Sequence, residues 1–334
     1  VESSKLVAEK YKSSLTENTG VLQQSADAPS NPYYDMFASE DLSSVKEVLL
    51  WRQYARGLVT HNINAAASRG NYRVGLTRGL VQNFLMLDGS PVYTHGSYAD
   101  GDGYYMGDKT ISDVRANRDP RLSIFLKEPG QKNILFELDN IEGTEAVITE
   151  PYPAITSGDG ERGYATGYAL RKGGSFNRKH YANGGGYTGQ VYFRAAEALL
   201  NYMEASYLLN GSLDASAREY WTIIRKRAGI STDFDKTISL TDMQKEAEND
   251  WGAYTAGNIL QDKTLYNIRR ERRCEFMAEG LRYMDLRRWR SMDQLISSPS
   301  HLEGMHLWNT PMEEWYQDEN GKSTLIADGT DKSN

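Results

Sequence analysis

The sequence predicts a mainly α-helical protein with long helices, extensive irregular loops and a few short strands. Two features indicate the helices: apolar residues recur at helical spacing between residues 191 and 228, and a long charged helical pattern runs from Asp262 to about Leu295. A third feature indicates the loops, because residues 31–150 are interrupted by turn signals such as Asn31-Pro32, Asp119-Pro120 and Pro129-Gly130.

Residues 191–210 and 214–228 are predicted to form a helical hairpin. Small and apolar residues line one face of the first helix: Tyr192, Ala195, Ala196, Leu199, Leu200, Met203 and Tyr207. Asn210-Gly211 and Gly229 suit the left-handed ends of the two helices, and Asp214 is a suitable cap for the second. The alanines would let a neighbouring helix approach closely, as in a tetratricopeptide (TPR)-like pair, but no second copy is found. Partner helices are therefore expected from elsewhere.

Other elements are expected on either side of the hairpin. Residues 1–30 begin with a short helical pattern, residues 134–138 and 146–149 are strand-like, and residues 240–250 form a further helix. Ten glycines lie between Gly158 and Gly189, interleaved with tyrosines, and they predict long surface loops or a ligand lid.

Composition excludes some classes of function. The net charge of −7 argues against a nucleic-acid partner, because phosphate binding needs a basic face. No apolar run reaches the roughly 18–20 residues of a membrane span. A single cysteine, Cys274, permits neither an internal disulfide nor a multi-thiolate metal site. The chain holds 22 tyrosines and 6 tryptophans but only 8 phenylalanines, and such amphipathic rings suit half-wet surfaces, including those that stack on sugars.

The segment IRRERRCEFMAEGLRYMDLRRW, residues 268–289, interleaves arginines with four acids. Each acid has an arginine within one helical turn, which favours paired, ionised carboxylates over catalytic ones. We therefore predict a structural ion-pair network that fixes the geometry of the helices, formed by Arg272, Glu275, Glu279, Arg282, Asp285 and Arg288.

This segment resembles the signature of the SusD-like (RagB/SusD) family, in which an Ile-x-x-Glu-Arg-Arg run continues to Asp-Leu-Arg-Arg-Trp. Two other segments resemble the family independently and in the right order: residues 194–211 followed by IIRKRAGI at 223–230, and NRDPRL at 117–122. Looser matches lie at residues 31–37, 46–54 and 88–91. The resemblance covers about residues 31–289.

The resemblance implies a single SusD-like domain over residues 1–334 that comprises the central and C-terminal portion of the fold. The N-terminal repeats and the C-terminal end are expected to be missing. It also implies a non-catalytic protein of the outer membrane surface that binds a glycan or other nutrient and delivers oligosaccharide to a SusC-like TonB-dependent transporter. Such a protein is a lipoprotein, whose lipid anchor would lie outside this chain. No cofactor is implied.

The ligand site is expected in aromatic loops. Tyr98, Tyr104 and Tyr105 lie in the loop of residues 93–108, and Trp308 lies in the C-terminal loops; aromatic faces of this kind stack on sugar rings. Asp100, Asp102 and Asp108 in the same loop depart from the EF-hand pattern at two positions, so only a calcium site of another kind stays open.

Two alternative functions remain open. A helical glycoside hydrolase would need two unpaired carboxylates in a cleft, and no pair stands out among 45 acids. A helical-repeat scaffold for protein partners would explain the hairpin but not the tyrosine-rich and glycine-rich loops. His301, Glu303 and His306 make a weak metal-binding pattern.

Overall fold

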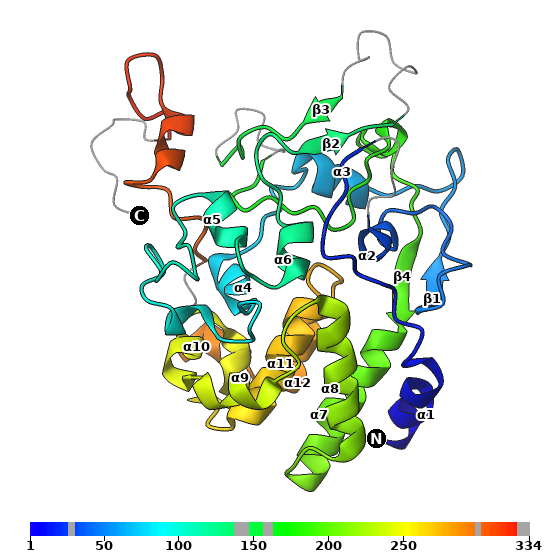
Figure 1. The fold of residues 1–334 in the computed structure, drawn as a ribbon. Helices are drawn as coiled ribbons and strands as arrows, with labels where there is room; N and C mark the ends of the chain where they lie inside the picture. The colour runs from blue at the N-terminus through cyan, green and yellow to red at the C-terminus, as the bar shows by residue number, and fades with distance from the viewer. Residues whose placement is uncertain (26–30, 137–146, 156–162, 298–301, 326–334) are drawn as a thin grey trace.

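The structure is a computed structural model that describes residues 1–25, 31–136, 147–155, 163–297 and 302–325. Long helices occupy one half of the molecule, and irregular loops with short helices and strands occupy the other (Figure 1). This arrangement confirms the predicted fold class. The helical half consists of α1 (Glu2–Tyr11), α7 (Ala195–Asn210), α8 (Ala215–Ala228), α9 (Phe234–Leu240), α10 (Met243–Asn249), α11 (Lys263–Glu275) and α12 (Arg282–Arg288).

The loop half contains mostly elements of a few residues each. Its helices are α2 (Pro32–Asp35), α3 (Ile63–Arg69), α4 (Arg78–Asn83), α5 (Ile111–Arg115) and α6 (Pro120–Phe125). Single 3₁₀ turns are η1 (Val92–Thr94), η2 (Arg178–His180) and η4 (Pro311–Tyr316); η3 (Trp251–Ala253) and α13 (Gln294–Ser297) follow α10 and α12.

The α7–α8 hairpin forms as the sequence predicts. Gly211 and Gly229 end the two helices with φ values of 69° and 86°, a conformation that costs glycine little. The Asp214 carboxylate accepts a hydrogen bond from the Ala217 amide and so caps α8. The hairpin buries a continuous apolar cluster with α1 and α9, in which the Trp221 ring stacks flat on Phe234 at 4.5 Å.

The first hairpin helix begins later than predicted. Residues 190–194 form the strand β4 (Gln190–Arg194) instead, which pairs antiparallel with β1 (Val48–Arg52). Val48 lies opposite Arg194, and the Ala195 amide donates to the Glu47 carbonyl where the helix starts. Pairing with a strand about 140 residues earlier overrides the local helical periodicity, as tertiary context commonly does for strands.

The expected helix 240–250 forms as the single helix α10, which begins at Met243 after its cap Asp242, and the preceding helix α9 was not expected. The other long predicted helix, 262–295, is divided into three helices, α11, α12 and α13. The first of its breaks falls where Ala278 and Gly280 adopt φ values of 60° and 81°, which a right-handed helix cannot continue through.

Short strand pairs complete the fold. β2 (Lys132–Ile134) pairs antiparallel with β3 (Ile148–Thr149), close to the strands expected at 134–138 and 146–149; residues 137–146 lie outside the described part. β5 (Tyr254–Thr255) pairs with β6 (Asn258–Ile259). In the glycine-rich region, residues 156–162 are not described, and Tyr164, Tyr168 and Tyr187 are buried rather than displayed on a surface loop.

Helix α11 is the seam between the two halves. Ile268 and the following Phe276 pack into the cluster of the hairpin, whereas Cys274 and Met277 pack into the larger cluster of the loop half. The remaining face of α11 carries acids and arginines of the segment 268–289, so these charges are buried between the two clusters.

Candidate functional site

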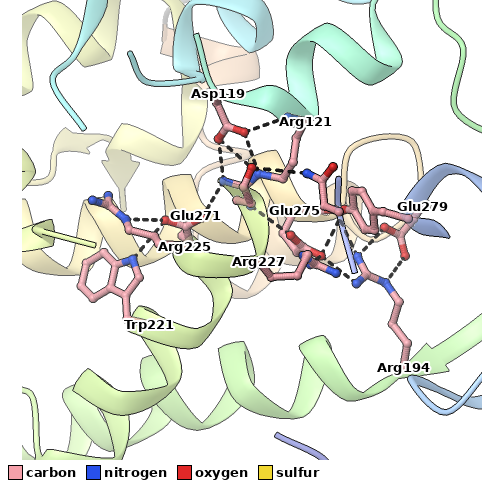
Figure 2. A network of polar contacts seen from close by, with 12 residues as sticks. Asp119, Arg121, Arg194, Trp221, Arg225, Arg227, Glu271, Glu275 and Glu279 are labelled. Carbon is pink, nitrogen blue, oxygen red and sulfur yellow. Dashed lines mark hydrogen bonds and ion pairs between the residues drawn. The ribbon is translucent and has the colours of Figure 1, made fainter. Parts of the chain in front are cut away.

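Glu275, the last residue of α11, is the centre of a buried ion-pair network (Figure 2). Its side chain is fully buried and receives guanidinium hydrogen bonds from Arg121 at 2.9 Å, Arg194 at 2.7 Å and Arg227. The Tyr33 hydroxyl donates to the same carboxylate at 3.2 Å. Helix α6, strand β4 and helix α8 therefore all donate to one carboxylate.

A second buried acid, Glu271, lies one turn earlier on α11. It accepts hydrogen bonds from Arg121 at 2.7 Å, from Arg225 at 3.0 Å and from the Trp221 indole at 3.0 Å. Asp119 binds the other edge of the Arg121 guanidinium through Nε and Nη2. Arg121 therefore bridges the start of α6 to both acids of α11 (Figure 2).

Glu279 joins the network although the chain is no longer helical there. Both of its oxygens accept from Arg194, at 2.7 and 2.9 Å, and one accepts from Lys172 at 2.6 Å. The left-handed Ala278 turns the chain so that this carboxylate still faces Arg194.

The remaining predicted residues form a second cluster on α12. Arg272 donates twice from Nε to Asp285, at 2.8 and 2.9 Å, and Arg288 donates to Asp285 and to Glu204 of α7. Arg282 pairs with Asp250 instead. The structure thus places all six predicted network residues in ion pairs, in three groups rather than one.

Sequence reasoning missed most of the first group, namely Glu47, Asp119, Arg121, Lys172, Arg194, Arg225, Arg227 and Glu271. The signal was present, because Asp119 and Arg121 belong to the NRDPRL segment, Arg194 opens the second segment and Arg225 and Arg227 belong to IIRKRAGI. The three segments that resembled the SusD-like signature meet around the two acids of α11 (Figure 2).

The electrostatics of the network keep its acids charged. Burial by itself would raise the pKa of Glu275, but the charges of Arg227, Arg194 and Arg121 outweigh it and hold that pKa well below its usual range. The pKa values of Glu271 and Glu279 are lowered in the same way, against burial, by Arg121 and Arg194 respectively. Carboxylates held ionised like this cannot serve as general acids at neutral pH.

The aromatic loop of residues 93–108 lies in the loop half. Tyr105 is buried with Met86 and Val92, its hydroxyl donates to the Tyr98 carbonyl at 3.1 Å, and Arg118 lies over its ring. The expectation of an open ring at Tyr105 is therefore corrected: its apolar neighbours draw it into the core.

Tyr98 and Tyr104 are both half-buried. The Tyr104 ring lies 5.2 Å from the His95 ring, and its backbone is fixed because the Asp102 carboxylate accepts from the amides of both Tyr104 and Tyr105. His95 in turn contacts Asp102 at 2.8 Å and the Ser90 hydroxyl at 2.7 Å. Hydrogen bonds within the loop therefore fix the backbone that carries Tyr104.

The segment that contains Trp308 reaches the same loop. The buried Asp108 carboxylate binds His306 at 2.8 Å and Arg78 at 2.6 Å, and the Arg78 guanidinium lies over the Tyr98 ring. Trp308, two residues on, is half-buried and packs against the main cluster of the loop half. Whether Tyr98, Tyr104 and Trp308 contact a ligand stays a prediction.

The acids of this loop do not converge on one point. Asp100 pairs with Lys109, Asp102 with His95 and Asp108 with Arg78 and His306. Among the residues with a described placement, no group of three or more His, Cys, Asp or Glu side chains could hold a metal ion. His301 lies outside the described residues, and His306 is engaged by Asp108. The expectation that no cofactor is needed stays a prediction.

Comparison with known proteins gives the family. The family model of the SusD family matches residues 24–326, almost the whole chain. The chain belongs to the SusD family. No curated protein matches it. Among solved structures, a SusD-like protein from Bacteroides fragilis has a TM-score of 0.56 at 23% identity, over 87% of this chain and 51% of its own. A SusD-like carbohydrate-binding protein from the same species has a TM-score of 0.49 at 19% identity, over 86% and 48%.

The SusD-like chain spans only about half the length of the solved structures it matches, and the first of these structures establishes the fold. A separate observation concerns the membrane. Within the described ranges, no helix is both long and apolar enough to cross a lipid bilayer.

Proposed function

We propose that this SusD-like chain is a non-catalytic glycan-binding module of a surface lipoprotein of the outer membrane, which hands oligosaccharide to a SusC-like TonB-dependent transporter. The observation that carries the proposal is membership of the SusD family over residues 24–326. The network around Glu275 supports it, because it accounts for the family signature as a scaffold and leaves binding to the loops.

Two features of the described residues favour binding over catalysis. The buried acids of the signature are held ionised by arginines, whereas a glycoside hydrolase needs one protonated carboxylic acid and a second carboxylate about 5–9.5 Å away. The backbone of Tyr104 is held by a hydrogen bond to Asp102, and its ring contacts His95, so the ring could serve as a rigid platform for a sugar.

Calorimetric titration of oligosaccharides into the purified chain tests the proposal. Tyr104→Ala is expected to weaken binding roughly 2- to 10-fold, the loss of one aromatic contact. Tyr192→Ala is the matched control, because Tyr192 is 59% exposed on β4, outside the loop. Equal binding by Tyr104→Ala and the wild type would remove this loop from the site.

Two further measurements address the rest of the proposal. Incubation of a bound glycan with the pure protein is expected to leave the glycan intact, and product formation would overturn the non-catalytic assignment. The protein is expected to co-purify from outer membranes with a SusC-like TonB-dependent transporter. Recovery of the two proteins in separate complexes would overturn the transport role.

A further inference from the structure

Two arginines share one tyrosine ring at the end of α3. The Arg69 guanidinium lies 5.1 Å from the centre of the Tyr181 ring, and the Arg178 guanidinium lies 4.8 Å from the same centre. All three side chains are half-buried. Two positive charges thus contact one ring in a protein whose net charge is −7.

Neither arginine has a carboxylate partner among the residues that the structure describes. The two side chains that follow Arg178 do have one, because both Lys179 and His180 contact Glu40. The Arg178 Nε is buried without a hydrogen-bond partner within the described part of the chain. Other half-buried and buried arginines such as Arg78, Arg115 and Arg194 are matched by acids, whereas Arg118 and Arg171 donate to carbonyl oxygens. An incoming anion would supply the negative charge that Arg69 and Arg178 lack among the described residues.

Polar amides border these arginines. The Asn71 amide group donates to Asn183 at 3.4 Å, and the Asn62 amide group links the Tyr72 hydroxyl, at 2.5 Å, to the backbone amide of Gly184. These contacts join the loop after α3 to the glycine-rich segment. Asn71 is buried, and its Oδ1 accepts no hydrogen bond from any described residue. An unpaired buried acceptor costs about 1–3 kcal/mol, which a ligand hydroxyl could recover.

Tyr72, three residues after Arg69, adds an open ring. It is 63% exposed, and both Tyr72 and Arg73 adopt left-handed φ values, 65° and 54°. Two consecutive non-glycine residues in this region are strained by about 1–3 kcal/mol each, and such strain is concentrated at ligand-binding positions. The hydrogen bond from Asn62 fixes the direction of the hydroxyl, so the ring is held in place although it is exposed.

We propose that this region, the α3 loop site, binds an anionic sugar of a glycan: Arg69 and Arg178 take its carboxylate or sulfate, Asn71 and Asn183 take hydroxyls, and Tyr72 stacks on its ring. The inference rests on the proposed glycan-binding function and names the class of ligand. Guanidinium groups favour planar, bidentate contact with carboxylates and accept sulfate oxygens equally well. Uronic acids and sulfated sugars share this chemistry.

The test compares charged glycans with neutral counterparts of the same backbone. Tetragalacturonate and a sulfated galactan tetrasaccharide are titrated at about 150 mM salt, which screens non-specific attraction between exposed charges. Their carboxyl-reduced and desulfated forms are titrated in parallel. The variants are Arg69→Gln/Arg178→Gln and Tyr72→Ala. Arg52→Gln is the matched control, because Arg52 lies over the Tyr54 ring at 4.9 Å and likewise has no carboxylate partner among the described residues. Circular dichroism checks that every variant is folded.

The expected result is at least tenfold tighter binding of one charged glycan than of its neutral counterpart. The double arginine variant should lose that preference, Tyr72→Ala should weaken binding of both forms at this site, and Arg52→Gln should keep the preference. The glycan that is preferred distinguishes a uronate from a sulfate. Equal binding of charged and neutral forms by the wild type, or a preference that survives in the double variant, would overturn the inference alone. Binding of no glycan at all would overturn the proposed function together with it.

Discussion

Replacing Glu275 by glutamine tests the claim that the family signature is a scaffold. The change keeps the shape of the side chain but removes a negative charge that Arg121, Arg194 and Arg227 all contact. The positive charge of three buried guanidinium groups is then compensated less, since the other acids that they contact, Glu47, Asp119, Glu271 and Glu279, are already hydrogen-bonded.

The expected loss of unfolding free energy is about 3–5 kcal/mol, the usual cost of removing one partner from a buried ion pair. Proteins of this kind are stable by only about 5–15 kcal/mol, so the variant should be poorly expressed or partly unfolded. An exposed ion pair serves as the control for the loss of unfolding free energy. Asp235→Asn breaks the Arg218–Asp235 pair, whose side chains are 48% and 63% exposed, and should cost less than about 1 kcal/mol.

Urea unfolding followed by tryptophan fluorescence measures both variants. Trp221 reports on the network directly, because its indole donates to Glu271. A loss below about 1 kcal/mol for Glu275→Gln, equal to that of the exposed control, would refute the scaffold reasoning. Stable protein that has selectively lost glycan binding would show that Glu275 belongs to the ligand site instead.

The pH dependence of the wild type follows from the same residue. The folded pKa of Glu275 lies well below the unfolded value of 4.5, so the unfolded chain binds the proton first as the pH falls. Its contribution is therefore complete above about pH 4.5 and is lost progressively below it. Glu275→Gln should lack this acid-dependent part of the stability, and parallel curves for the two proteins between pH 5 and 3 would contradict the sign.

Two other substitutions probe the neighbouring structure. Ala278 is exposed at φ 60°, so Ala278→Gly should leave the unfolding free energy unchanged or raise it by up to about 1 kcal/mol, and Ala278→Val should lower it; the opposite order in urea unfolding would contradict the assigned turn. Burial lowers the pKa of Lys127 to about 8, although the adjacent Glu150 opposes the shift, so the unfolded chain holds more protons than the folded one between pH 8 and 10.5 and stability should rise with pH across that range. The rise should be absent from the stability curve of Lys127→Met. Equal slopes of unfolding free energy against pH for the two proteins between pH 7.5 and 9.5 would refute the assignment.

The sequence by itself determined the family, the fold class and the hairpin. Local signals were sufficient where they agreed with the final packing: Asp214 caps α8, and Gly211 and Gly229 end their helices because these functions depend only on neighbouring residues. The interleaved charges of residues 268–289 also indicated ion pairing correctly in kind, since acids and arginines lie within a turn of each other.

Tertiary structure decided which partners those charges have. The pattern suggested pairs along one helix, but Glu271, Glu275 and Glu279 pair mainly with Arg121, Arg194, Arg225 and Arg227 from distant segments. Strand pairing with β1 moved the start of α7, and two left-handed residues divided the long helix. The same reason applies to Tyr105 and to the α3 loop site. Burial of a ring, or the absence of a described acid paired with Arg69, depends on contacts between segments far apart in the chain, and no local pattern records them.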